Sequence, residues 1–81
     1  MQHDSDLSVL VRLQTYQESR KHIFPSKSSQ DWYVRQHHDQ LVSDGALLMI
    51  AGTWHVHPSR FDATVLELGA KAAQRRHREA A

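Results

Sequence analysis

The residues of this sequence whose chemistry is most conspicuous are two histidines at strand spacing, His55 and His57. In an extended strand, residues two apart lie on the same face, so both imidazoles could reach one ligand. Imidazole nitrogens bind zinc, and His37 or His38 could join such a site. A zinc site usually needs a third or fourth ligand and partners that orient each imidazole, and the sequence identifies neither. We therefore interpret His55 and His57 as polar groups on an exposed face or donors to phosphate, and predict no metal.

A second group of residues has the chemistry of nucleic-acid recognition. Small polar and cationic side chains gather at the start of a helix predicted over residues 25–45, where hydroxyls and ammonium groups suit phosphates. These residues are Ser26, Lys27, Ser28, Ser29 and Gln30. Further along, Arg35 and Gln36 can bind the edges of guanine and adenine, respectively. Alternatively, this is simply a capped, solvated amphipathic helix.

Catalysis, by contrast, is not indicated by any pattern in the sequence. The serines lack a nucleophile elbow, no pair of carboxylates has a spacing that suggests acid–base catalysis, and no glycine loop could cradle a phosphate. The absence of cysteine excludes thiolate chemistry, disulfides and cysteine-based zinc fingers. We predict a protein that is not an enzyme and that has no cofactor and no small-molecule substrate.

The helix over residues 25–45 must present these side chains. Ser26 or Ser28 can cap its start, and Gly45 is a suitable residue just beyond its end. At 100° per residue, one face of the helix is largely apolar. It carries Tyr33, Val34, His37 and Leu41. Trp32 falls on the polar side, so we predict that it packs beneath a neighbouring segment; the alternative is an interaction surface.

Two shorter elements are predicted before this helix. The stretch "VLVRL" (9–13) favours a brief strand, and a helix starting near Leu7 is the alternative. In "TYQE", Thr15 and Glu18 fit a capping box, which predicts a helix that runs to about Lys21.

After the helix, the pattern indicates a β-hairpin and a final helix. "ALLMI" and "TWHVH" are rich in β-forming residues and flank a turn at Ala51-Gly52, where a positive backbone angle would explain the glycine. Pro58 ends the second strand because it lacks a backbone N–H. Ser59 is the predicted cap of the final helix. The apolar residues of that helix recur at helical spacing, at Phe61, Val65, Leu68 and Ala72.

This order of elements predicts an α+β fold, a small winged helix-turn-helix with three helices, a β-hairpin wing and a short N-terminal strand. The second helix of the pair would enter the DNA major groove, and the wing would add contacts from Gly52, Thr53 and His55. We divide the chain into a flexible N-terminus (1–8), the DNA-binding domain (9–69) and a basic helical tail (70–81).

Length and composition agree with a single small domain. The chain has 81 residues, of which 40% are hydrophobic and 23% charged, and its net charge of +1 is low for a DNA-binding domain. No segment approaches the ~20 apolar residues that a membrane span requires, and no secretory leader is apparent. We therefore expect no membrane association and a cytoplasmic location.

Residues 9–69 resemble the excisionase family of winged-helix proteins, also called recombination directionality factors, which are related in fold to the DNA-binding domain of MerR-type regulators. The matching features are an aromatic–basic stretch in the second helix, strands around a tight turn, and an acidic residue after a phenylalanine. They are Trp32-Tyr33-Val34-Arg35, Gly45-Ala46-Leu47-Leu48, Gly52, Trp54, Val56 and Phe61-Asp62. The turn "KHIFPSKSS" is longer than the compact turn common in the family.

The resemblance implies a protein that binds double-stranded DNA at repeated sites beside an attachment site, bends it, and directs a tyrosine integrase towards excision. It also implies head-to-tail self-association on DNA and, in some members, transcription regulation of a mobile element. A different interpretation is a small phage or mobile-element protein that uses the same fold to bind or inhibit a host protein.

Overall fold

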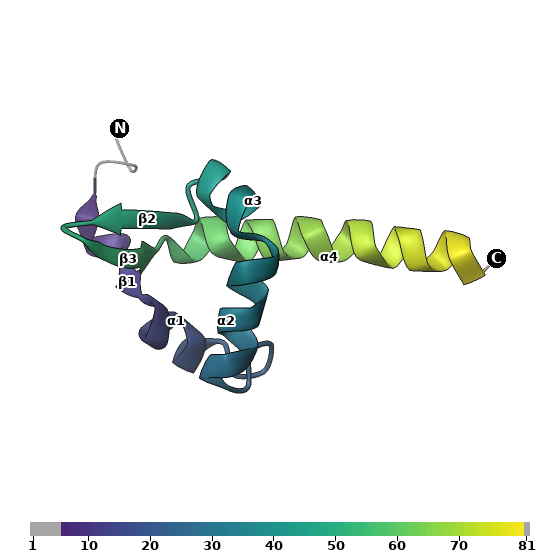
Figure 1. The fold of residues 1–81 in the computed structure, drawn as a ribbon, viewed down its shortest axis with the longest axis horizontal. Helices are drawn as coiled ribbons and strands as arrows, with labels where there is room; N and C mark the ends of the chain where they lie inside the picture. The colour runs from purple at the N-terminus through teal and green to yellow at the C-terminus, as the bar shows by residue number, and fades with distance from the viewer. Residues whose placement is uncertain (1–5, 81) are drawn as a thin grey trace.

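The computed structural model describes residues 6–80, with the side chains up to Glu79, and shows a small α+β fold (Figure 1). Within this range there are four α-helices, one more than predicted, and a three-stranded antiparallel sheet. In chain order the elements are the 3-10 helix η2 (Leu7–Val9), β1 (Val11–Arg12), α1 (Leu13–Ser19), α2 (Lys27–Gln36), α3 (His38–Ser43), β2 (Leu47–Ile50), β3 (Thr53–Val56) and α4 (Pro58–Ala80). The predicted flexible segment 1–8 lies mostly outside the described residues, but Ser8 is in η2, and the Asp6 side chain caps this 3-10 helix by accepting from the Ser8 N–H.

The sheet joins the start of the chain to the predicted hairpin. Its strand order is β1-β3-β2, and Val56 on β3 pairs with both Val11 on β1 and Leu47 on β2. This confirms the brief N-terminal strand, while the alternative helix from Leu7 is limited to the single turn of η2. The hairpin is also confirmed, with positive φ at both turn residues, Ala51 (51°) and Gly52 (78°). Such a turn matches the right-handed twist of the two strands.

The first helix begins earlier than the sequence pattern predicts. α1 follows β1 directly at Leu13, its N-cap is Arg12, and no side chain caps it, so the predicted cap at Thr15 is wrong. Glu18 instead accepts a hydrogen bond from Gln14 within the helix, at 3.4 Å. α1 ends at Ser19, two residues before the predicted end. The pairing of β1 with β3 fixes the chain just ahead of Leu13, and this tertiary constraint overrides the local capping signal.

The long helix predicted over residues 25–45 is two helices, α2 and α3, separated at His37. The backbone leaves helical geometry there (φ −123°, ψ 26°), and the imidazole packs on the ring of Tyr33 with a centroid distance of 4.5 Å. The change of direction allows Leu41 on α3 to be completely buried in the core. A single straight helix was therefore the wrong prediction, because the apolar periodicity continues across a bend.

Both ends of this helix pair have strong local caps. Ser26 accepts from the Ser29 N–H at 3.1 Å, and the Ser29 hydroxyl in turn contacts the Ser26 N–H, which completes a capping box. At the other end, Gly45 has a φ of 74°. The N–H groups of Gly45 and Ala46 donate to the carbonyls of Val42 and Leu41, which is the Schellman arrangement. The predicted stop signal at Gly45 is thus confirmed, and of the two predicted caps the structure uses Ser26.

The last helix, α4, begins at Pro58 rather than after Ser59. His57 takes the capping position: its Nδ1 accepts from the Arg60 N–H at 3.3 Å, and its carbonyl accepts from Phe61. Proline is well suited to the first helical turn because no intrahelical partner is needed for its missing N–H. α4 continues without interruption through Gly69 and projects beyond the other elements (Figure 1).

A mainly aromatic core holds these elements together. The buried apolar residues are Tyr16, Phe24, Leu41, Ala46, Leu47, Val56 and Phe61. The rings of Tyr16 and Phe61 lie 4.5 Å apart, so α1 and α4 are packed directly against each other. Among the described residues, no helix has the length and apolar character that crossing a membrane requires.

Candidate nucleic-acid interface

The outward face of α2 is polar and exposed over its whole length. Lys27 and Ser28 in the first turn and Arg35 and Gln36 in the last are all exposed to solvent. Trp32 lies between them and is 56% exposed, so the prediction that it packs beneath a neighbouring segment is wrong, and the alternative, an interaction surface, stays a prediction. Lys27 lies 3.8 Å from Asp31, an exposed pair that contributes little to stability. An exposed indole beside cations and hydroxyls can stack on, or pack against, a partner.

Gln30, which was also predicted to contact nucleic acid from the start of α2, is buried inside the molecule instead. It is 1% exposed, and its Nε2 donates to the Leu13 carbonyl at 2.9 Å. Its Oε1 has no hydrogen-bond partner within the described residues. Leu13 is the first residue of α1, so the hydrogen bond from Gln30 to the Leu13 carbonyl requires α2 to pack against the start of α1. Gln30 therefore positions α2 against α1 and cannot read DNA.

The end of α2 opens into a polar groove. Arg35 and Gln36 line it together with the residues of the bend, and Leu68 contributes from α4. The other lining residues are His37, His38, Asp39 and Gln40, and the volume of the groove is about 360 Å³. The groove places the predicted base-reading residues, Arg35 and Gln36, close to a histidine-rich bend that the sequence pattern predicted as helix interior.

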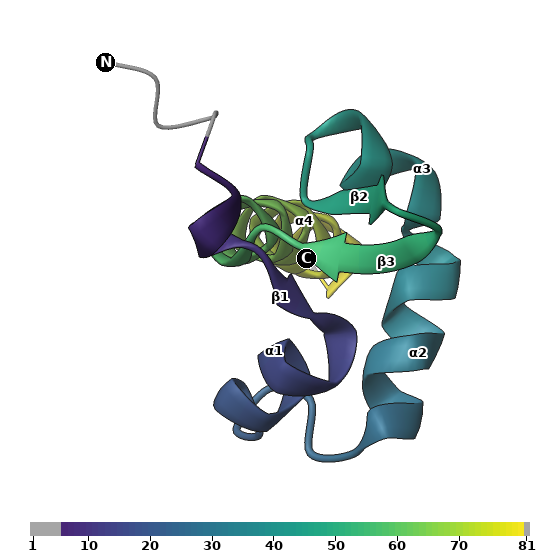
Figure 2. The ribbon, with the colours of Figure 1, turned by 90° about the vertical axis from the view of Figure 1, so that its left-hand side faces the viewer.

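The hairpin presents its turn to solvent on the same side as α2. Figure 2 shows α2 and the β2–β3 turn on the right, with α1 on the left and α4 running behind. Gly52 is exposed at the turn, and a Cβ added to it would meet no atom within 4 Å, whereas Thr53 and His55 are half-buried. A second groove of about 490 Å³ separates the hairpin from α1. Its lining residues are Arg12, Leu13, Gln14, Thr15, Gly52, Thr53 and Trp54.

The histidines have separate structural roles. His55 Nδ1 lies 3.0 Å from the Thr53 carbonyl, His57 caps α4, and His38 packs edge-on against Trp54 with centroids 5.4 Å apart. His37 packs on Tyr33. Over residues 6–80, no three His, Asp or Glu side chains are arranged to hold a metal ion.

Away from the α2 face, an ion pair and hydrogen bonds centred on Asp62 hold α1 against α4. Asp62 accepts from the Tyr16 hydroxyl at 2.5 Å and from Arg20 Nε and Nη2 at 2.9 and 2.7 Å. The Arg20 hydrogen bonds are the main cause that lowers the pKa of Asp62, whereas burial is the main cause that raises the pKa of Tyr16. Asp62 was singled out from the sequence only as part of a family pattern; its partners are 42 and 46 residues away in the chain, so no local signal could identify them.

Charge is unevenly divided between the folded body and the projecting half of α4. Residues 6–68 contain six lysines and arginines and seven acids, whereas residues 69–80 contain four and one, respectively. The body is therefore close to neutral, and the projecting half of α4 is basic. Among its cations, Lys71 lies 3.3 Å from Glu67.

Comparison of the chain with protein-family models, curated proteins and solved structures found no match.

Proposed function

We propose that this protein is a winged helix-turn-helix protein that binds double-stranded DNA sequence-specifically and has no enzymatic activity. α1 and α2 would form the helical pair, with α2 in the major groove, and the β2–β3 hairpin would be the wing. The observation that carries the proposal is that α2 and the exposed β2–β3 turn lie on the same side of the molecule, so that one surface could contact both (Figure 2).

The composition of the α2 face supports DNA as that surface. Ser26, Lys27, Ser28 and Ser29 surround the start of α2, where hydroxyls, an ammonium group and the helix N-terminus suit phosphate oxygens. Arg35 is exposed and has a planar guanidinium that matches the major-groove edge of guanine. Ser26 and Ser29 also form the capping box of α2, whereas Ser28, Arg35 and Gln36 are exposed and make no side-chain hydrogen bond or ion pair within the described residues.

The experiment that tests this proposal is fluorescence polarisation with labelled duplexes from immediately upstream of the gene and from a neighbouring integrase attachment site. If Arg35 reads a base, R35A should weaken binding to the specific duplex by about 1–3 kcal/mol, or roughly 5- to 150-fold, and binding to random DNA much less. Q36A removes the other predicted base-reading side chain, and it should show the same preference for loss on the specific duplex if Gln36 reads a base. Equal losses on both duplexes would assign Arg35 to the phosphate backbone, and no binding of the wild-type chain to any duplex would refute the proposal.

In the cell, we propose that the protein acts as an excisionase, or recombination directionality factor, for a tyrosine integrase, with a further role in transcription regulation of a mobile element. This role rests on the resemblance of residues 9–69 to that family. A domain of this size offers few base contacts, which favours several copies bound head to tail on adjacent sites. In an excision assay with a tyrosine integrase encoded near its gene, the wild-type chain should increase excision, R35A should not, and no effect of the wild-type chain would refute this role.

One observation favours a second candidate function, the binding of a host protein. An apolar groove of about 330 Å³ lies between α1 and α4, flanked by Ile23 and Leu66, which are 52% and 74% exposed. Arg20 and His22 also line this groove and would suit an apolar protein segment with acidic flanks. Salt separates the two functions, because DNA binding weakens steeply as salt rises, whereas an apolar protein contact hardly responds.

A further inference from the structure

We propose that the projecting half of α4 is a second site for the DNA backbone, in which Lys71, Arg75 and Arg78 bind consecutive phosphates beyond the α2 contact. This inference rests on the proposed function and extends it to residues outside the helix-turn-helix and the wing.

The three cations form one stripe on α4. They are separated by four and three residues, and at 100° per residue they fall within an arc of roughly 60°. Arg76 lies about 100° from Arg75, away from this stripe. The stripe extends over about 10 Å of helix, at 1.5 Å per residue. Because duplex DNA carries one charge per roughly 1.7 Å of its axis, a stripe of this length can meet more than one phosphate.

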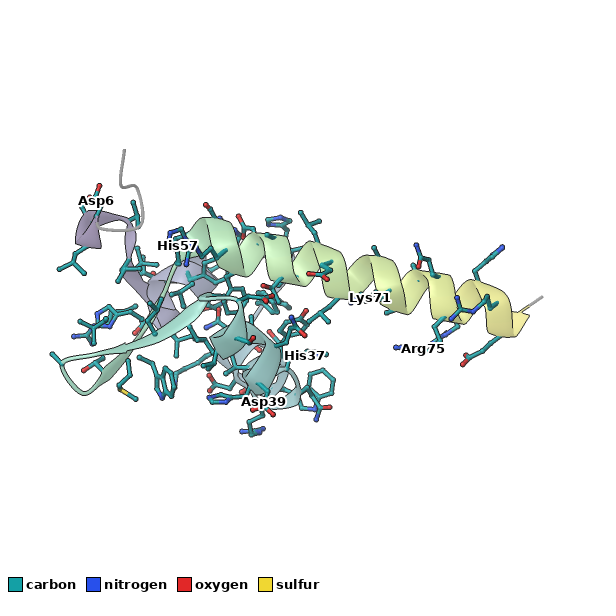
Figure 3. The ribbon with its side chains drawn as sticks, turned by 90° about the horizontal axis from the view of Figure 1, so that it is seen from above. Asp6, His37, Asp39, His57, Lys71 and Arg75 are labelled. Carbon is teal, nitrogen blue, oxygen red and sulfur yellow. The ribbon has the colours of Figure 1, made fainter. Side chains whose placement is uncertain are left out.

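The body of the protein fixes the direction in which the stripe points. Thr64 precedes Lys71 by seven residues and therefore shares its side of α4, and its hydroxyl donates to Asp44, the C-cap of α3, at 2.7 Å. In Figure 3, Lys71 and Arg75 lie on the edge of α4 that faces His37 and Asp39. The stripe is thus on the side of the molecule that carries α2 and α3.

A groove connects this side of α4 with the proposed base-reading residues. Leu68, one turn before Lys71, lines the same polar groove as Arg35 and Gln36. A DNA backbone that passes the end of α2 would therefore reach the basic stripe on α4 without crossing the apolar groove between α1 and α4.

Neutralisation of the stripe within the described residues is limited to Lys71, which has an ion pair with Glu67 and, after the hydrogen bonds from Thr64 and Gln40, helps to lower the pKa of Asp44. Both side chains of the Lys71–Glu67 pair are more than half exposed, so the pair is weak. The ion pairs of the described residues do not include Arg75 or Arg78, although Glu79 follows Arg75 by four residues. Like charges four apart, as at Lys71 and Arg75, disfavour an isolated helix, and phosphate groups would remove this repulsion.

The test compares the salt dependence of DNA binding for the wild-type chain, the double variant R75A/R78A and the control R76A. Alanine is the best helix former, so all three should retain the same helical circular dichroism. Each lost phosphate contact lowers the slope of log K against log salt by about 0.9, so R75A/R78A should reduce it by about 1.8. R76A should leave the slope almost unchanged, and R35A should mainly lower the preference for the specific duplex.

The outcomes separate this inference from the proposed function. If the wild-type chain binds no DNA, the proposed function fails and the inference fails with it. If it binds DNA and R75A/R78A has the wild-type slope, only the inference is wrong. A slope loss for R76A half as large as that for the double variant would indicate diffuse charge and overturn the stripe. Intact single-site binding with loss of cooperativity on tandem sites would assign α4 to a protein partner instead, which also overturns it.

Discussion

Removal of the Asp62 carboxylate tests how this small fold holds α1 against α4. In D62A, the Tyr16 hydroxyl, which belongs to a residue that is 2% exposed in the wild-type chain, loses its acceptor. A buried polar group left without a partner costs about 1–3 kcal/mol. The Arg20–Asp62 pair, with side chains 28% and 40% exposed, adds about 0.2–1 kcal/mol because water screens it. We expect D62A to lower the free energy of unfolding by about 1–4 kcal/mol in total, with a midpoint of about 2.5 kcal/mol.

Urea and thermal unfolding of the wild-type and variant chains, followed by circular dichroism, would measure this loss. For a domain of this size, 1 kcal/mol corresponds to a shift in Tm of about 4–8 °C, so D62A should melt roughly 10–20 °C below the wild type. Y16F is the matched variant: it removes the hydroxyl, leaves the Arg20–Asp62 pair, and should cost about 1 kcal/mol. In the double variant D62A/Y16F no hydroxyl is left unsatisfied, so its cost should be smaller than the sum of the single costs.

The sign of the pH dependence provides an independent check. The pKa of Asp62 is lowered in the folded state, mainly by the hydrogen bonds from Arg20. Ionised Asp62 therefore stabilises the folded chain fully at pH values above the pKa of an aspartate in the unfolded chain, about 3.9. This stabilisation is lost as the pH falls through the lowered pKa of Asp62 in the folded chain. The stability difference between wild type and D62A should therefore be constant near neutral pH and shrink below about pH 4. A D62A cost below about 0.5 kcal/mol at neutral pH, or strict additivity with Y16F, would refute this account of the network.

Two further substitutions test the local signals. S26A removes the capping box of α2 and should cost about 1 kcal/mol in urea unfolding, whereas S28A, in the same turn, should cost less than about 0.5 kcal/mol; equal costs would contradict the role of Ser26. G52V places a β-branched residue at a φ of 78° and should distort the hairpin turn, so DNA binding measured by polarisation should weaken while the domain stays folded. G52N, which tolerates this φ, should bind more tightly than G52V, and wild-type affinity for G52V would remove the hairpin from the interface.

The turns and helix ends that are set by neighbouring residues in the chain were predicted correctly. The Ala51-Gly52 turn lies between two β-rich runs, Ser26 precedes a polar first turn, and Gly45 follows the last helical residues. Each signal acts within about four residues, through a backbone angle or a capping hydrogen bond, and so it can be recognised without knowledge of the fold. The exposed α2 face was also predicted, because helical periodicity alone separates Arg35 from Val34.

The errors occurred where distant segments decide the structure. Thr15 offers a good local cap, but β1 pairs with β3 and starts α1 at Leu13. The periodicity of residues 25–45 is continuous, yet the backbone leaves helical geometry at His37, and Leu41 enters the core shared with α1 and α4 from a separate helix. Periodicity reports which face is apolar and is insensitive to a change in helix direction.

The sequence by itself determined the hairpin turn, the α2 capping box and the polar face of α2, because neighbouring residues supply the geometry and the hydrogen bonds for each. Only the tertiary structure decided that Gln30 is buried, that Trp32 is exposed and that Asp62 joins Tyr16 and Arg20. A polar side chain becomes internal when a distant segment supplies its partner, as the Leu13 carbonyl does for Gln30, 17 residues away. Such partners are chosen by packing across the whole chain, and residue type and spacing do not specify them.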